Sequence, residues 1–123
     1  MRILVLAREP VDAARVRGGL PGEDLDGAEV LVVAPATQES GLKFWMSDAD
    51  EAIADASERA DETASALRSE GAHARTETGE SDPVVAVRDA LATFPADRIL
   101  VFGDDDLAHT VRQEVDVEVT AAR

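Results

Sequence analysis

Three consecutive carboxylates, Asp104, Asp105 and Asp106, are the side chains of this sequence best placed to do chemistry. They follow Gly103 and a four-residue apolar run, so they should stand at the carboxyl end of a buried strand. One interpretation is that they cap a helix and favour the positive end of its dipole. The other is a Mg²⁺ or Ca²⁺ site completed by Glu9 or a carbonyl. Adjacent residues rarely converge on one ion, so capping is preferred and no metal site is predicted.

Arg8 is a second candidate, because it comes directly after the first apolar run of the chain. If the first and fourth strands are neighbours and parallel, they end at the same edge of the sheet, where ligands usually bind in such folds. The hypothesis is that Arg8 pairs with one of the three aspartates and fills the crevice there. The alternative is a solvated arginine.

The other reactive residue types give no catalytic pattern. His73 and His109 are isolated in the sequence, without metal-ligand spacing, and are interpreted as incidental. No Ser, His and Asp arrangement resembles a nucleophile elbow, so no catalytic residue is predicted.

Phe44, Trp45 and Met46 form an apolar cluster after the second predicted strand. Such a cluster usually packs its loop onto the body of the protein. The alternative is an apolar lid or a contact for a protein partner, since exposed aromatic groups anchor interfaces.

Charge and composition limit the classes of partner and the location that can be expected for this protein. The 123 residues include 26 acidic and 12 basic ones, for a net charge of −14. Binding to nucleic acids or anionic membranes depends on cationic groups, so neither is expected as a partner. There is no cysteine, and no apolar run is long enough for a signal peptide or a membrane span. A cytoplasmic protein with one domain over residues 1–123 and no cofactor is expected.

Strands and helices must alternate to position these residues. Apolar or alternating runs predict five strands, at residues 3–7, 28–34, 72–78, 98–102 and 115–120. Helical spacing and breakers predict four helices between them, within 8–27 and at 47–70, 83–94 and 107–115. This alternation favours a Rossmann-like three-layer α/β/α sandwich with a parallel sheet.

Three details of these elements are specific enough to check. Gly71 should take the left-handed conformation that ends the second helix. The third helix should bury Val84, Val87, Leu91 and Phe94, and the short first helix Val11, Ala14 and Val16. In the last strand, Val115, Val117 and Val119 should face inward, opposite Asp116, Glu118 and Thr120.

Taken together, the segments resemble the universal stress protein family. The resemblance is carried by the strands Ile3-Leu4-Val5 and Val30-Leu31-Val32-Val33, by Gly79 with Pro83, and by the stretch from Ala96 to Gly103. It implies a five-stranded parallel sheet of order 3-2-1-4-5, similar to the adenine nucleotide α-hydrolase-like fold. It also implies frequent dimers and, in many members, ATP bound at the strand ends.

The chain departs from the ATP-binding members of that family at two places. Arg8 stands where they carry an aspartate, and only Gly103 remains of their glycine-rich loop. A polyphosphate needs main-chain N–H groups at glycine turns or a helix start. Carboxylates within about 4 Å would repel it by a few kcal/mol at an effective dielectric constant near 20. Metal-free ATP binding is therefore not expected.

The preferred function is a non-enzymatic, universal-stress-protein-like module that acts through self-association or protein binding. The alternative is a small-molecule or nucleotide binder with a reduced crevice between the first and fourth strands. In that case Ala34 and Gly103 would contact an adenine-type ring. An enzyme using a cation at the three aspartates ranks last. Dimerisation through the last strand would oppose the like charges of Asp116 and Glu118.

Overall fold

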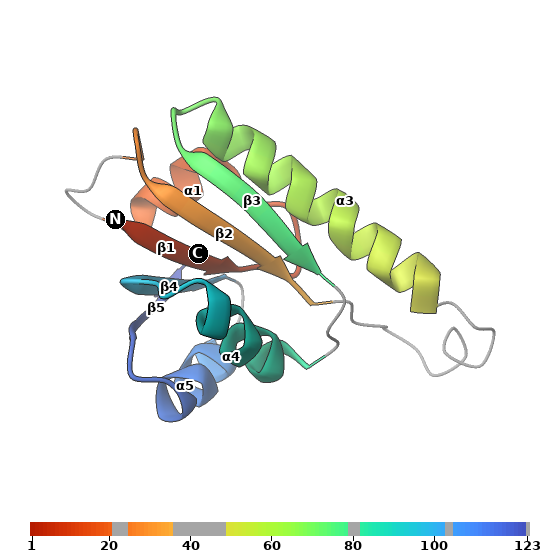
Figure 1. Cartoon of the computed structure of the whole chain (residues 1–123), viewed down its shortest axis with the longest axis vertical. Helices are drawn as coiled ribbons and strands as arrows, with labels where there is room; N and C mark the ends of the chain where they lie inside the picture. The colour runs from red at the N-terminus through yellow and green to blue at the C-terminus, as the bar shows by residue number, and fades with distance from the viewer. Residues whose placement is uncertain (21–24, 36–48, 79–81, 103–104, 123) are drawn as a thin grey trace.

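The computed structural model describes residues 1–20, 25–35, 49–78, 82–102 and 105–122, along which strands and helices alternate (Figure 1). The strands are β1 (Arg2–Leu6), β2 (Glu29–Ala34), β3 (His73–Thr78), β4 (Arg98–Phe102) and β5 (Glu118–Ala122). The helices are α1 (Ala13–Gly18), α3 (Ala49–Arg68), α4 (Pro83–Thr93) and α5 (Asp105–Glu114). Over the described ranges, no helix combines the length and the apolar character that crossing a membrane requires.

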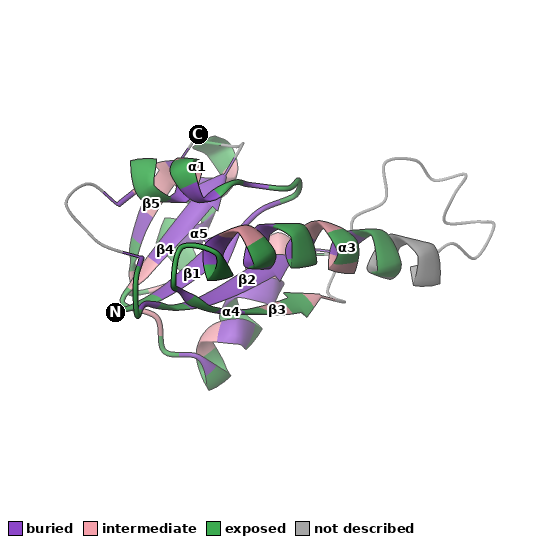
Figure 2. Cartoon of the chain, turned by 90° about the horizontal axis from the view of Figure 1, so that it is seen from above, coloured by how far each residue is buried: buried purple, intermediate pink, exposed green. Residues whose placement is uncertain are grey.

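The five strands form one parallel sheet in the order β3-β2-β1-β4-β5. At its centre, Leu4 of β1 lies in register between Leu31 of β2 and Ile99 of β4. α1 and α3 cover one face, and α4 and α5 cover the other (Figure 2). The predicted α/β class and strand order are therefore confirmed.

Alternate residues of the central strands belong to two separate cores. Ile3 and Val5 pack with α1 and α3, whereas Leu4 and Leu6 pack with α4 and α5. All four are at most 1% exposed. A strand covered on both faces has no position for a solvated side chain, which explains its uninterrupted apolar sequence.

Local signals set the helix ends. The Asp82 side chain accepts a hydrogen bond of 2.9 Å from the Val84 N–H, and Pro83 occupies the first helical position of α4, where no N–H is needed. After α3, Gly71 has a φ of +91° and donates its N–H to the Arg68 carbonyl at 3.0 Å. The expected left-handed glycine is confirmed.

The prediction for the last strand was wrong at its start. β5 begins at Glu118, in register with Arg98 of β4, so Val115 and Val117 precede it. Both valines are half-buried against the core beneath α4 and α5. Their alternation reflects packing of the connection from α5, which an alternating pattern cannot distinguish from a strand.

The buried stripes of two helices also differ from the prediction. In α4, Ala86 and Ala90 are buried with Val87 and Phe94, while Val84 and Leu91 are only partly buried. Small side chains let a helix approach a sheet closely, and the larger residues then border the contact. In α1, Ala14 is exposed, and Ala13 is buried beside Val11 and Val16 instead.

Each edge strand of the sheet carries an arginine on a main-chain carbonyl. Arg68 donates from Nε to the Ala74 carbonyl of β3 at 2.9 Å, and Arg112 donates from Nε to the Val119 carbonyl of β5 at 3.1 Å. A strand adding to an edge needs unpaired main-chain groups. Each arginine therefore occupies one main-chain carbonyl that an incoming strand would otherwise use for pairing.

Candidate functional site

The carboxyl ends of β1 and β4 lie side by side at one edge of the sheet (Figure 1). Leu6 is in register with Val101, and Ala7 extends β1 by donating its N–H to the Val33 carbonyl at 3.2 Å. Arg8 follows with an exposed side chain. The structure thus brings the end of β1 to the same edge as the connection from β4 to α5. The proposed pairing of Arg8 with an aspartate stays a prediction.

Phe102 fills the end of β4 on the α1 side. Its ring is 3% exposed and belongs to the core beneath α1 and α3. The guanidinium carbon of Arg15 lies over it, 5.5 Å from the ring centroid. The main-chain N–H of Arg15 donates to the carboxylate of Asp12, the N-cap of α1, at 2.8 Å, which fixes the start of that helix. A ring and a guanidinium therefore occupy the end of β4 on this face of the sheet.

A buried hydrogen bond anchors the segment after β1 to α3. The Val11 N–H donates to the Thr63 hydroxyl at 3.0 Å, and this hydroxyl donates to the Arg59 carbonyl at 3.2 Å. Thr63 is 1% exposed, and the bond satisfies a buried main-chain N–H. The Nε of Arg59 is buried without a partner among the described residues. The segment after β1 is therefore joined to α3 by a buried hydrogen bond.

Asp105 and Asp106 lie in the first turn of α5 and are exposed. Negative side chains at that end complement the helix dipole, as the capping interpretation requires. Gly103 and Asp104 lie outside the described residues. Across the ranges that the structure describes, no three His, Cys, Asp or Glu side chains are grouped to hold a metal ion.

Ala34 ends β2 and is 1% exposed. It borders a small cavity of about 40 Å³ between β2, β3 and α4. This volume is far below the roughly 300–1,000 Å³ that is usual for small-molecule sites. Ala34 is a core residue in the part of the chain described.

The remaining candidates divide into two groups. Phe44, Trp45 and Met46 lie outside the described residues. His109 is exposed on α5, with its Nε2 3.2 Å from the Gln113 amide nitrogen. His73, by contrast, lies beside a cavity.

That cavity, at the amino-terminal edge of the sheet, is a site that no sequence motif predicted. It has a volume of about 510 Å³ and is called the amino-end pocket below. Its walls come from distant segments and include Arg2, Glu29, Arg68, His73, Arg75 and Phe94. One signal could have found part of it, since His73 and Arg75 alternate along an edge strand and so share one of its faces.

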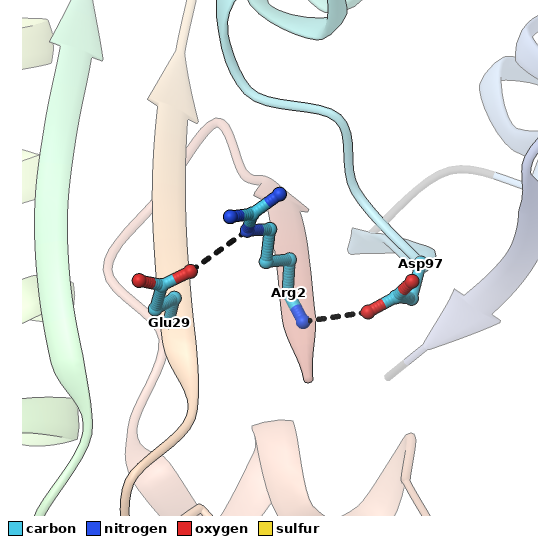
Figure 3. A network of polar contacts seen from close by, with 3 residues as sticks. All are labelled: Arg2, Glu29 and Asp97. Carbon is cyan, nitrogen blue, oxygen red and sulfur yellow. Dashed lines mark hydrogen bonds and ion pairs between the residues drawn. The ribbon is translucent and has the colours of Figure 1, made fainter.

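An ion pair orders one side of the amino-end pocket. Arg2 donates from Nε to a Glu29 carboxylate oxygen at 2.8 Å (Figure 3). The main-chain N–H of Arg2 donates to the Asp97 carboxylate at 2.9 Å, and the main-chain N–H of Asp97 donates to the Arg2 carbonyl at 2.8 Å. The hydrogen bond and charge of Arg2 lower the pKa of Glu29, and those of Glu29 raise the pKa of Arg2. Both groups therefore stay charged and paired at neutral pH.

Comparison with known proteins identifies the fold. No protein-family model matches the chain, and no curated protein matches it in sequence. Among solved structures, a universal stress protein from Archaeoglobus fulgidus aligns over 100% of this chain and 93% of its own, with 21% identity and a TM-score of 0.68. A universal stress protein from the same organism in complex with dAMP aligns over 100% and 98%, with 20% identity and a TM-score of 0.58. The resemblance inferred from the sequence is thus confirmed at the level of the fold.

Proposed function

We propose that this chain, which has the fold of the universal stress proteins, is a non-enzymatic module that does not hold ATP and acts through contacts with protein surfaces. The proposal that the chain does not hold ATP rests on the position of Asp105 and Asp106. They occupy the first turn of the helix that follows β4, at its positive end. Main-chain N–H groups at such an end bind phosphate. Carboxylates at the same end interact with the positive end of the helix dipole and repel a phosphate group there.

Charge, more than space, would exclude ATP from this site. ATP brings several negative charges, and each carboxylate within about 4 Å opposes one of them by a few kcal/mol at an effective dielectric constant near 20. This arrangement favours exclusion of a triphosphate unless a metal ion offsets the carboxylates.

The second part of the proposal rests on the exposed face of α3. Four acidic side chains there are exposed, namely Asp55, Glu58, Asp61 and Glu62. Complementary charge accelerates encounter and suppresses wrong partners, so this face suits a cationic protein surface. It would equally repel a second copy of itself.

A second candidate function is binding of a nucleoside monophosphate in a reduced crevice between β1 and β4. It is favoured by the structural neighbour solved with dAMP. One phosphate brings less charge than three, and Arg8 lies exposed at that edge. Ala34 and Gly103 would then be the residues nearest the base, as the sequence suggested.

Titration calorimetry with ATP and AMP, each with and without Mg²⁺, tests the exclusion of ATP. We expect no heat of binding for ATP without metal. Saturable binding of AMP alone would favour the second candidate, and tight metal-free binding of ATP would contradict the proposal.

A double variant isolates the charge argument. If Asp105 and Asp106 exclude ATP, changing both to asparagine should allow measurable binding, because it removes two charges at the helix end. The matched control removes two charges from α3, with Glu58→Gln and Glu62→Gln, and should leave ATP unbound. Equal behaviour of the two double variants would refute a local role for the aspartates.

Sedimentation at low and high salt tests self-association. Because like charges oppose pairing of two copies, we expect the dimer fraction to rise with salt, which screens that repulsion. Replacing Asp116 and Glu118 with asparagine and glutamine should raise the dimer fraction at low salt if β5 forms the interface. Replacing Asp61 and Glu62 in the same way is the matched control. A monomer under every condition would rule out self-association and leave contact with another protein.

A further inference from the structure

We propose that the amino-end pocket binds a small organic anion with a planar apolar body, such as an aromatic carboxylate. This site lies at the opposite edge of the sheet from the ends of β1 and β4, so the proposal is independent of the function proposed above. Its volume of about 510 Å³ falls in the usual range for small-molecule sites, roughly 300–1,000 Å³.

The pocket is cationic in a chain that is strongly anionic. Three arginines border it, Arg2, Arg68 and Arg75, and the carboxylate among the named walls is that of Glu29. The whole chain has a net charge of −14. A local concentration of guanidinium groups against that background marks a place where an anion is favoured. Nucleic acid and anionic membranes are poor occupants, because the net charge of −14 of the whole chain would repel a large anionic partner.

Two of the three arginines form no ion pair with a carboxylate of the described residues. Arg2 is paired with Glu29, which neutralises it. Arg68 donates from Nε to the Ala74 carbonyl, a neutral group that orients its side chain along the edge of β3. Within the described residues, neither Arg68 nor Arg75 lies within 4.0 Å of a carboxylate. Their terminal N–H groups can therefore serve a ligand.

Apolar side chains also line the pocket. Phe94 is 6% exposed, and the guanidinium carbon of Arg75 lies over its ring, 5.4 Å from the centroid. A guanidinium that uses its face on a ring keeps N–H donors at its edge, in the geometry that matches a carboxylate. Pro95, Ala72 and Ala74 also line the cavity. The site thus combines an oriented anion-binding group with apolar surface for a flat body.

A nuclear magnetic resonance titration with benzoate tests this proposal on the full chain. We expect saturable shifts of the main-chain amide signals of His73, Arg75 and Phe94 at millimolar benzoate. Benzamide, which has the same ring without the charge, and inorganic phosphate, which has charge without the ring, should each bind at least about tenfold more weakly. Equal binding of benzamide or of phosphate would overturn the proposal, as would the absence of saturable shifts with benzoate.

Variants locate the site. Arg75→Gln should weaken benzoate binding at least about tenfold, because it removes a charged donor from the wall. Arg88→Gln removes the same charge from an exposed position on α4, outside the named walls of the pocket, and should leave the affinity unchanged. Both positions are exposed, and an amide spectrum with the native dispersion verifies the fold of each variant. Equal losses in the two variants would show a general charge effect and overturn the assignment.

Discussion

Replacing Phe102 with alanine is expected to lower the free energy of unfolding by about 3–5 kcal/mol. The ring is 3% exposed at the end of β4, so truncation removes its packing against the core and leaves a cavity. It also removes the surface over which the Arg15 guanidinium lies. Total stabilities of about 5–15 kcal/mol are usual, so the loss should be a large fraction of the whole. Urea unfolding followed by circular dichroism at neutral pH measures it.

Phe102→Leu is the matched control for this prediction. Leucine keeps most of the apolar burial but offers no aromatic face to Arg15, so the loss should stay below about 1.5 kcal/mol. If the alanine variant lost less than about 1 kcal/mol, the ring would not be the group that fills this end of the crevice.

Gly71→Ala should produce the second large loss. Gly71 has a φ of +91°, where a residue with a Cβ costs about 1–2 kcal/mol. An added Cβ would also collide with the carboxylate of Asp26. The turn is linked to the start of β2, because the Gly27 N–H donates to the Gly71 carbonyl at 3.0 Å. Thermal and urea unfolding should show a loss beyond the dihedral cost alone.

Two other glycines separate the contributions to that loss. Gly27 also has a positive φ, +80°, but a Cβ there meets nothing within 4 Å, so Gly27→Ala should show the dihedral cost alone. Gly18, at the last position of α1, has free space and no positive φ, and its replacement by alanine should stabilise by up to about 0.5–1 kcal/mol. Equal losses at Gly71 and Gly27 would mean that the Asp26 side chain moves away without cost.

The strands of the central sheet could be predicted because burial on two faces removes every polar position. The runs at β1, β2 and β4 are apolar for that reason, and β3 alternates because one of its faces is partly exposed at the edge of the sheet. β5 was located less well, since the alternation of Val115 and Val117 comes from packing before the strand. A pattern of period two records which side chains are buried without recording what buries them.

The predicted site residues illustrate the same limit. Arg8 and Asp105 could be assigned to one edge of the sheet, because parallel neighbouring strands end together. The contact between Arg15 and Phe102 could not be predicted from the sequence, since it joins the first turn of α1 to the last residue of β4. Ala34 is buried in the core at the end of β2, and its expected contact with a base stays a prediction.

By itself the sequence determined the alternation of elements, the order of the sheet through its family resemblance, and the strongly anionic character of the chain. These follow from residue types and from periods of two and of three to four residues, which are local properties. Only the tertiary structure decided that a ring and a guanidinium occupy the end of β4, and that arginines from three segments gather at the amino-terminal edge. Such groupings depend on which distant residues the packed helices and strands bring within a few ångströms, and no local period encodes that distance.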